Sequence, residues 1–196
     1  MQKLAILVTK LSSWVLSKMG RGGSMPGRLG IKIAPDCLNH LKFGGPVILV
    51  TGTNGKTSTA NMVSDLMEEA GYKVVTNRKG DNLRVGITST LLSHCSLSGR
   101  VKADAAILEV DELNMKYIVP ALPVTAIVVN NFFRDQLDRA GEMERIIDTI
   151  ESVLPDYQGD LILNGNDPNV VRLAMAAPNA RKIYFGAAKN ASTVEH

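Results

Sequence analysis

The segment VILVTGTNGKTSTANMV, residues 47 to 63, constrains the fold more than any other part of the chain. An apolar, strand-like run over residues 47–50 breaks into a glycine-containing turn, and a helical pattern follows the turn. This order predicts a phosphate-binding loop, because the backbone N–H groups of such a turn and the positive end of the next helix all point at one anion. Lys56 would add a charge for the terminal phosphates, and Thr57 a hydroxyl for a Mg²⁺ shell.

The loop departs from the general pattern G-x-x-x-x-G-K-[ST], because Val50 stands where the first glycine belongs and Gly52 takes its place. The alternative is a chance Gly-Lys-Thr in a turn, which the preceding strand and the following helix argue against. Lys56 is also a candidate catalytic residue. The residues predicted to bind the nucleotide through this loop are Gly52, Thr53, Asn54, Gly55, Lys56, Thr57 and Ser58.

Composition favours one α/β domain. The 196 residues are 45% hydrophobic, which is enough for a core of ordinary size, and six strand signals alternate with helical patterns. We therefore predict a mostly parallel sheet flanked by helices, with the nucleotide at the carboxyl ends of the strands.

A net charge of +3 without a basic run gives nucleic-acid binding no support. Cys37 and Cys95 are far apart and form no Cys-x-x-Cys pair, which argues against a disulfide framework and favours a reducing cytoplasm.

Residues 1–44 are predicted to form an amphipathic helix and a glycine-rich leader before the main domain, residues 45–196. The first apolar run is cut short by Lys10 and resembles neither a signal peptide nor a membrane span. We expect this helix to pack on its own domain; docking on a membrane surface or a partner is the alternative, for which three lysines are thin evidence. Residues 20–30 predict a loop, and residues 31–41 a short helix. The predicted apolar face of the first helix consists of Leu4, Leu7, Val8, Leu11, Val15 and Met19.

Three carboxylates follow the buried-type strand predicted at residues 105–108: Glu109, Asp111 and Glu112. A carboxylate at a strand end beside a phosphate loop is what a nucleotide-bound Mg²⁺ requires. We therefore predict that Thr57 and Glu109 hold the metal and that Glu109 is catalytic. For Asp111 and Glu112 the alternative is the first turn of the next helix, where negative charge is favourable in any case.

The polar turn after the strand at residues 73–76 also leaves the carboxyl end of a strand, where open α/β sheets bind ligands. A solvated turn with no ligand is an equally good interpretation. The candidate substrate-binding residues here are Asn77, Arg78, Asn82 and Arg84. Further strands are predicted over residues 124–129, within 160–175 and over 182–185; in the second of these segments Asp167 caps a helix and Pro168 begins it.

The loop TGTNGKTST resembles the ATP loop of the Mur ligase and folylpolyglutamate synthase family. In that family ATP activates a carboxylate as an acyl phosphate, which an amine then attacks. The resemblance implies the Mur ligase central domain over residues 45–196 and a Mg²⁺-binding glutamate at the position of Glu109. It also implies that LNGNDP lies beside the adenine, so that Asn164 contacts the base or ribose and Asp167 belongs to the nucleotide site.

Two departures narrow the resemblance. In NNFFRDQLDRAGE, Gln136 stands where Mur ligases usually have histidine, and the following ERIIDTIESVL lacks the lysine whose carbamate binds a second Mg²⁺. A neutral amide is a poor ligand for a divalent cation, so we expect one strong metal site. Together with the GRGGSMPG leader, TNRKGDNL and LEVDE, this segment resembles the Mur ligase-like, ATP-binding subunits of lipid II isoglutaminyl synthases.

That resemblance implies an ATP-dependent carbon–nitrogen ligase that amidates the α-carboxyl of D-glutamate in the lipid II stem during peptidoglycan biosynthesis. A glutaminase partner would supply ammonia in a heterodimer, and the work would take place in the cytoplasm at the inner face of the plasma membrane. A zinc ribbon and a carboxy-terminal Mur domain are expected downstream of the strand at residues 182–185, so we expect an excerpt or a truncated product, with Zn²⁺ bound only in that ribbon. The alternatives are a Mur-type or folylpolyglutamate-type amino-acid ligase and a non-catalytic ATP-binding module.

Overall fold

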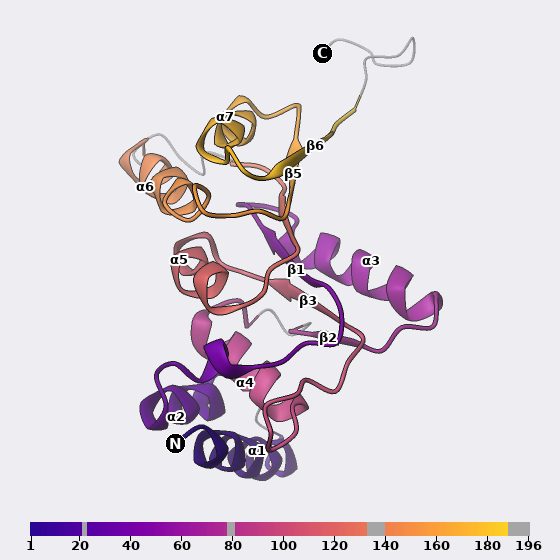
Figure 1. The fold of residues 1–196 in the computed structure, drawn as a ribbon, viewed down its shortest axis with the longest axis vertical. Helices are drawn as coiled ribbons and strands as arrows, with labels where there is room; N and C mark the ends of the chain where they lie inside the picture. Colours follow the sequence, from indigo (N-terminus) through magenta and orange to yellow (C-terminus); the bar gives the residue numbers. More distant parts are fainter. Residues whose placement is uncertain (21–22, 78–80, 133–139, 188–196) are drawn as a thin grey trace.

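The computed structural model describes residues 1–20, 23–77, 81–132 and 140–187. Within these residues six strands form one sheet in the order β2-β3-β1-β4-β5-β6, and every neighbouring pair is parallel (Figure 1). The predicted mostly parallel α/β sheet is confirmed. The strands are β1 (Val47–Thr51), β2 (Val74–Thr76), β3 (Ala105–Glu109), β4 (Ala126–Val129), β5 (Asp160–Asn164) and β6 (Arg181–Phe185).

Helices cover both faces of the sheet. Helix α3 packs on one face, and α4 to α7 lie on the other (Figure 1). All residues of β3 and β4 are buried, because a parallel strand covered on both faces has no solvent side, whereas most of the edge strand β6 is exposed. The helices are α1 (Gln2–Lys18), α2 (Met25–Ile33), α3 (Lys56–Glu69), α4 (Arg84–His94), α5 (Met115–Ile118), α6 (Ala140–Glu151) and α7 (Pro168–Ala176).

The prediction for residues 20–41 is wrong. Helix α2 begins at Met25, inside the predicted loop, and ends at Ile33, and a short 3₁₀ turn, Cys37–His40, replaces the rest of the predicted helix. Gly27 and Gly30 explain the error, because they allow close helix packing and do not mark a loop. A Cβ atom on Gly30 would lie 2.6 Å from Thr9 Oγ1 in α1 and 2.9 Å from Leu92 Cδ1 in α4. One on Gly27 would overlap the carbonyl of Val85 and approach Ser89 N to 2.6 Å.

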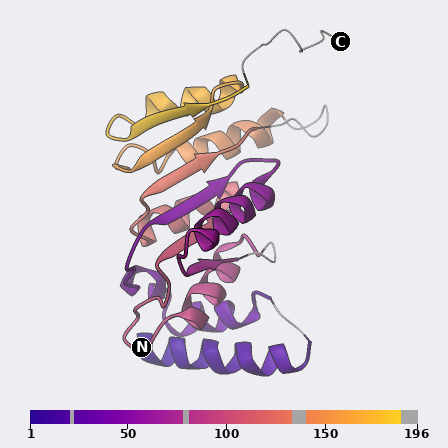
Figure 2. The same ribbon diagram turned by 90° about the vertical axis from the view of Figure 1, so that its right-hand side faces the viewer.

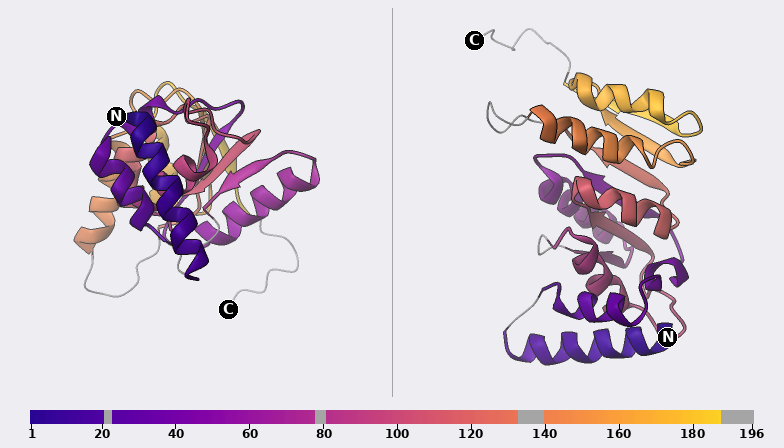
Figure 3. Two further views of the ribbon diagram at one scale, coloured as in Figure 1. Left: turned by 90° about the horizontal axis from the view of Figure 1, so that it is seen from below. Right: turned by 90° about the vertical axis from the view of Figure 1, so that its left-hand side faces the viewer.

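Helix α1 packs on its own domain, but through a different face from the one predicted. Its buried residues are Ala5, Ile6 and Thr9, and Ala5 and Ile6 join the main hydrophobic core. Helix α1 lies along one end of the molecule in Figure 2 and in the right-hand view of Figure 3, and it contacts α2 and α4. The predicted apolar face instead meets solvent: its exposed members are Leu4, Leu7, Leu11, Val15 and Met19.

In the part of the chain that the structure describes, no helix combines the length and the apolar character needed to span a bilayer.

The close contact of α2 with α4 predicts the effect of a single methyl group. Gly27→Ala should lower the free energy of unfolding by about 1–3 kcal/mol, because the new Cβ overlaps backbone atoms of α4 that have no flexible end to move. Gly141→Ala near the start of α6 is the matched control: its Cβ meets nothing within 4 Å, and the change should alter the free energy of unfolding by less than about 0.5 kcal/mol. Urea denaturation measures both. Equal stability of the Gly27→Ala variant and the wild type would contradict the described packing.

Candidate functional site

The predicted phosphate loop lies between β1 and α3 at the carboxyl edge of the sheet. Strand β1 has β3 on one side and β4 on the other, so Glu109 at the end of β3 and Asn130 just after β4 flank the loop. This is the place where parallel α/β sheets bind ligands, because the strand ends and the helix N-termini meet there.

The loop backbone has the geometry that an anion site needs. Gly52 and Gly55 have φ values of +121° and +79°, which residues other than glycine rarely adopt. A Cβ atom on Gly52 would lie 2.9 Å from both N and O of Asn131. Gly55 is the N-cap of α3, and no side-chain hydrogen bond caps this helix in the described structure. The first N–H groups of α3, including that of Ser58, have no acceptor in a preceding helical turn and would be available to an anion bound at the loop.

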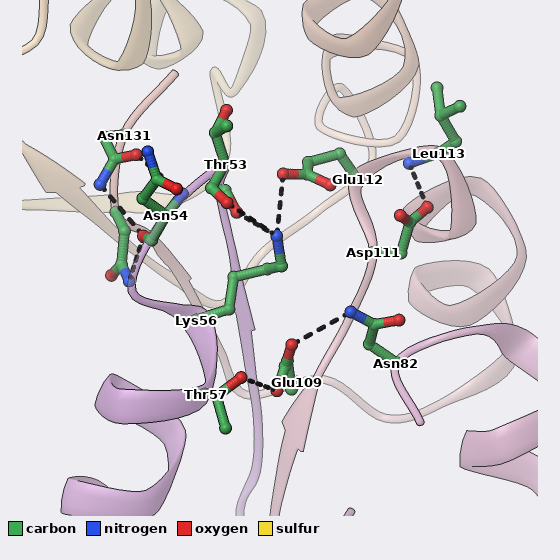
Figure 4. A network of polar contacts seen from close by, with 12 residues as sticks. Thr53, Asn54, Lys56, Thr57, Asn82, Glu109, Asp111, Glu112, Leu113 and Asn131 are labelled. Carbon is green, nitrogen blue, oxygen red and sulfur yellow. Dashed lines mark hydrogen bonds and ion pairs between the residues drawn. The ribbon is translucent and has the colours of Figure 1, made fainter. Parts of the chain in front are cut away.

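Lys56 is held over this loop by three acceptors. Its Nζ donates to the carbonyl oxygens of Gly52, at 2.6 Å, and Thr53, at 3.2 Å, and to Glu112 Oε1 at 3.3 Å (Figure 4). The Lys56 and Glu112 side chains are mostly buried, with relative exposures of 14% and 9%. Glu112 is therefore part of the site as the counter-ion of Lys56, a role that the sequence pattern did not indicate.

The two predicted metal ligands meet directly. Thr57 Oγ1 donates to Glu109 Oε2 at 2.7 Å, and the other carboxylate oxygen, Oε1, accepts from Asn82 Nδ2 at 3.0 Å (Figure 4). Asp111 turns away and caps the turn Glu112–Asn114 by accepting from Leu113 N. Among Glu109, Asp111 and Glu112, the structure thus places Glu109 beside Thr57, Glu112 beside Lys56, and Asp111 in a capping role.

Two asparagines after β4 clamp the loop, and the sequence prediction missed both. Asn131 accepts from Thr53 N through its carbonyl at 2.8 Å and from Asn54 N through Oδ1 at 3.0 Å, and its Nδ2 donates to Asn54 O at 3.1 Å. Asn130 Nδ2 donates to Asn54 O and to Thr59 Oγ1. The N–H groups of Thr53 and Asn54 are therefore used inside the protein, which leaves the α3 N-terminus as the main backbone donor to phosphate. The signal available in the sequence was the Asn-Asn pair at a strand end.

The residues predicted to bind the substrate do not form one group in the part of the chain that the structure describes. Asn77 is buried and exchanges two hydrogen bonds with the Glu109 backbone, at 2.8 and 2.9 Å, so it holds β2 to β3. Asn82 joins the site through Glu109. Arg84 points elsewhere: its Nη2 donates to Pro35 O at 2.7 Å, and its guanidinium lies 5.4 Å from the ring centre of Tyr117. Arg78 lies outside the described residues. Substrate contact by these four stays a prediction.

Asn164 and Asp167 lie one strand further along the same edge. Asn164 Nδ2 donates to Asn130 O at 2.8 Å, which connects it to the loop clamp. Asp167 caps α7 as predicted, accepting from Asn169 N and Val170 N, and its Oδ2 accepts from Phe132 N at 2.7 Å. Both residues therefore order the chain after β4 and β5, and their contact with a nucleotide stays a prediction.

The donor set fits a nucleotide with one Mg²⁺. The described residues contain no group of three His, Cys, Asp or Glu side chains that would bind a metal by themselves. One threonine hydroxyl and one glutamate carboxylate are what Mg²⁺ takes from a protein when phosphate oxygens and waters complete its octahedral shell. The second-metal prediction depends on Gln136, which lies outside the described residues.

A model of the Mur ligase middle domain matches residues 50–196 of the chain. The chain belongs to the Mur ligase family. This confirms the predicted family.

Two curated relatives cover nearly the whole chain. The subunit MurT of the glutamine-hydrolyzing lipid II isoglutaminyl synthase of Streptococcus pneumoniae is 34% identical over 187 residues, which are 93% of this chain and 40% of that protein. The corresponding subunit of Staphylococcus aureus is 30% identical over 196 residues, 99% of this chain and 44% of that protein. The chain thus spans less than half the length of these relatives.

Solved Mur ligases share the fold. The MurF ligase of Thermotoga maritima, solved in complex with ADP, aligns with 83% of this chain and 35% of its own at a TM-score of 0.59 and 18% identity. At this identity the likeness concerns the fold alone. It confirms the prediction that the sheet and its helices form a Mur ligase central domain.

The burial of Glu112 predicts how the stability of the fold depends on pH. Burial raises the pKa of the Glu112 carboxyl above its usual value of 4.5, and the nearby Lys56 only partly opposes this. A carboxyl whose pKa is higher in the folded than in the unfolded chain stabilises the fold at acid pH and loses that contribution as pH rises through the folded pKa. Relative to Glu112→Gln, the wild type should therefore lose stability as pH rises from about 4.5, then level off above the folded pKa.

Urea denaturation of both proteins across a pH series measures this difference. Glu69→Gln, which removes an exposed carboxylate at the far end of α3, is the control. A wild type that gains stability relative to Glu112→Gln as pH rises would contradict the assigned direction of the pKa shift.

Proposed function

We propose that the chain is the ATP-binding part of a ligase that amidates the D-glutamate α-carboxyl of the lipid II stem peptide, with ammonia released from glutamine by a partner. The observation that carries the proposal is the cluster of Lys56, Thr57 and Glu109 at the β1–α3 loop, in a chain that is 34% identical to a lipid II isoglutaminyl synthase subunit. The cluster supplies the ATP chemistry, and the relative supplies the substrate class.

The residues of the loop divide the work on ATP. The N–H groups at the start of α3 and the Lys56 amine would hold the phosphates, and Thr57 with Glu109 would hold a Mg²⁺ on their oxygens. MgATP bound there would transfer its γ-phosphoryl group to the carboxylate and leave as ADP, and ammonia would then displace inorganic phosphate from the acyl phosphate. To bind phosphate, Lys56 would exchange its contacts with Gly52, Thr53 and Glu112 for phosphate oxygens. Because its amine already lies at the loop, this exchange would require only a small movement.

The ammonia would come from a glutaminase partner. Both cysteines are buried, and burial raises the pKa of each thiol, so neither is a ready nucleophile for glutamine hydrolysis. His40 bonds to Asp36 and His94 to the carbonyl of Thr90, so in the described structure neither histidine is bonded to a cysteine. A lipid-linked substrate would place the reaction in the cytoplasm at the inner face of the plasma membrane.

The assignment of the loop predicts the loss of ATP binding in one variant. Lys56→Ala should weaken ATP binding roughly a hundredfold, because a charged donor to phosphate is worth about 2–3 kcal/mol. Isothermal titration calorimetry measures the affinity, with circular dichroism to show an intact fold. The matched control is Lys73→Ala, an exposed lysine before β2, which should bind ATP like the wild type.

Glu109→Gln separates the metal from the phosphate contacts. This change should weaken binding of MgATP and leave the much weaker binding of metal-free ATP unaltered, because Glu109 acts through Mg²⁺, whereas Lys56→Ala should weaken both. Unchanged ATP affinity in folded Lys56→Ala protein would refute the assignment of the loop.

We also predict that these 196 residues bind ATP but amidate nothing by themselves. The strand ends would cover the acyl phosphate from one side, and a ligase must shield it from water on the other side as well. Mass spectrometry of lipid II after incubation with ATP and glutamine measures amidation, and ADP release measures turnover. Amidation should require a glutaminase and the downstream part of a full-length relative. Amidated lipid II from the purified 196 residues alone would overturn the proposed division of labour, and ADP release driven by an added amino acid would favour a Mur-type amino-acid ligase.

A further inference from the structure

Helix α1 presents its large apolar side chains to solvent. Leu7 is 53% exposed, and Leu11 and Trp14 are each 60% exposed, although a short stretch of the same helix packs tightly on α2 and α4. At 100° per residue these side chains lie on the side of the helix opposite the buried Ala5 and Thr9. The exposed apolar side chains of this face, called here the α1 face, are Leu4, Leu7, Leu11, Trp14 and Val15.

The segment that carries the α1 face, residues 1–35, contains basic residues and no acidic ones. The first acidic residue of the chain is Asp36, and six basic residues precede it: Lys3, Lys10, Lys18, Arg21, Arg28 and Lys32. The whole chain has 22 basic and 19 acidic residues, so after residue 35 there are 16 basic residues against 19 acidic ones, a net charge of −3. The basic excess of the protein is therefore concentrated in the segment that carries α1.

We propose that the α1 face docks on an anionic phospholipid bilayer, with α1 lying in the plane of the interface. The face has the composition of an interfacial helix: leucines and a tryptophan on one side, lysines at its margins, and no acidic residue. Lys3 and Lys18 are exposed near the two ends of the helix, where their amines reach headgroup phosphates. A protein partner would need acidic side chains around its own apolar groove, whereas an anionic membrane supplies negative charge and an apolar layer together.

The docked orientation leaves the ATP site accessible. Helix α1 lies along one end of the molecule and the sheet extends away from it (Figure 2). The α1 face would therefore contact the membrane while the β1–α3 loop stays in water. The inference rests on exposure and charge and is independent of the proposed function, although a lipid-linked substrate is consistent with it.

The single tryptophan of the chain gives a direct measurement. Trp14 emission should shift to shorter wavelength when vesicles of equal parts phosphatidylglycerol and phosphatidylcholine are added, and shift less with phosphatidylcholine alone. Leu7→Glu combined with Leu11→Glu should abolish the shift. The matched control is Met62→Glu with Leu66→Glu, which places the same charges with the same spacing on the exposed side of α3, where the native residues are 63% and 66% exposed. This control should keep the shift.

A second pair of variants tests the charge. Lys3→Gln with Lys18→Gln should lower vesicle partitioning roughly tenfold or more, because each basic residue near an anionic surface contributes several-fold. Lys73→Gln with Lys102→Gln, two exposed lysines outside α1, should lower vesicle partitioning much less.

Three outcomes would each overturn the proposal: no emission shift with anionic vesicles, equal loss of the shift in the α3 control, or a shift that depends on protein concentration without lipid. The last would indicate a second copy on the α1 face. ATP affinity, measured in the same variants, should be unchanged, so a failure of membrane binding is distinguishable from a failure of the proposed function.

Discussion

The site depends on the central place of β1 in the sheet. Because β1 pairs with β3 on one side and β4 on the other, Glu109 and the asparagines after β4 reach the loop from opposite sides. Asn131 then bonds both N–H groups of Thr53 and Asn54, and Glu109 bonds Thr57. The loop is therefore organised by its neighbours before any ligand binds, which reduces the conformational entropy that nucleotide binding must remove.

The Lys56 amine must be stable while mostly buried without a ligand, and it must also be available to phosphate. Its ion pair with Glu112 is compatible with both requirements. An unpaired ammonium that is mostly buried would be costly, and Glu112 reduces that cost in the absence of phosphate. The pair is long at 3.3 Å, and burial holds the Glu112 pKa above its usual value, because desolvation disfavours the charged carboxylate. Phosphate oxygens at the proposed site would compete with a moderate counter-ion, so Lys56 would exchange partners at low cost.

The sequence was sufficient for the sheet, the loop and the Thr57–Glu109 pair, because buried parallel strands leave continuous apolar runs and their carboxyl ends meet at one edge. It failed where one residue type serves two purposes. Gly27 and Gly30 were interpreted as loop glycines, although their role is to let α2 approach α4 and α1 closely. Asn131 was missed because amide side chains that bond a distant backbone leave no periodic signal. Gly-rich and Asn-rich segments thus require tertiary contacts before their role is clear.

Helix α1 shows a limit of apolar periodicity as a guide to the core. Its apolar stripe was predicted to be buried, but the contact with α2 and α4 is made by small or polar positions, Ala5 and Thr9, together with Ile6. The reason is the close approach of the helices at Gly30, which leaves no room for leucines. Full burial of a leucine side chain is worth about 1.5–3 kcal/mol, and roughly half of this free energy remains unrealised for Leu4, Leu7 and Leu11, which are 50%, 53% and 60% exposed. Insertion of these leucines into an anionic membrane would realise this free energy, and the basic residues of the same segment would favour that membrane. The packing of α1 and the charge of its segment thus point to the same partner.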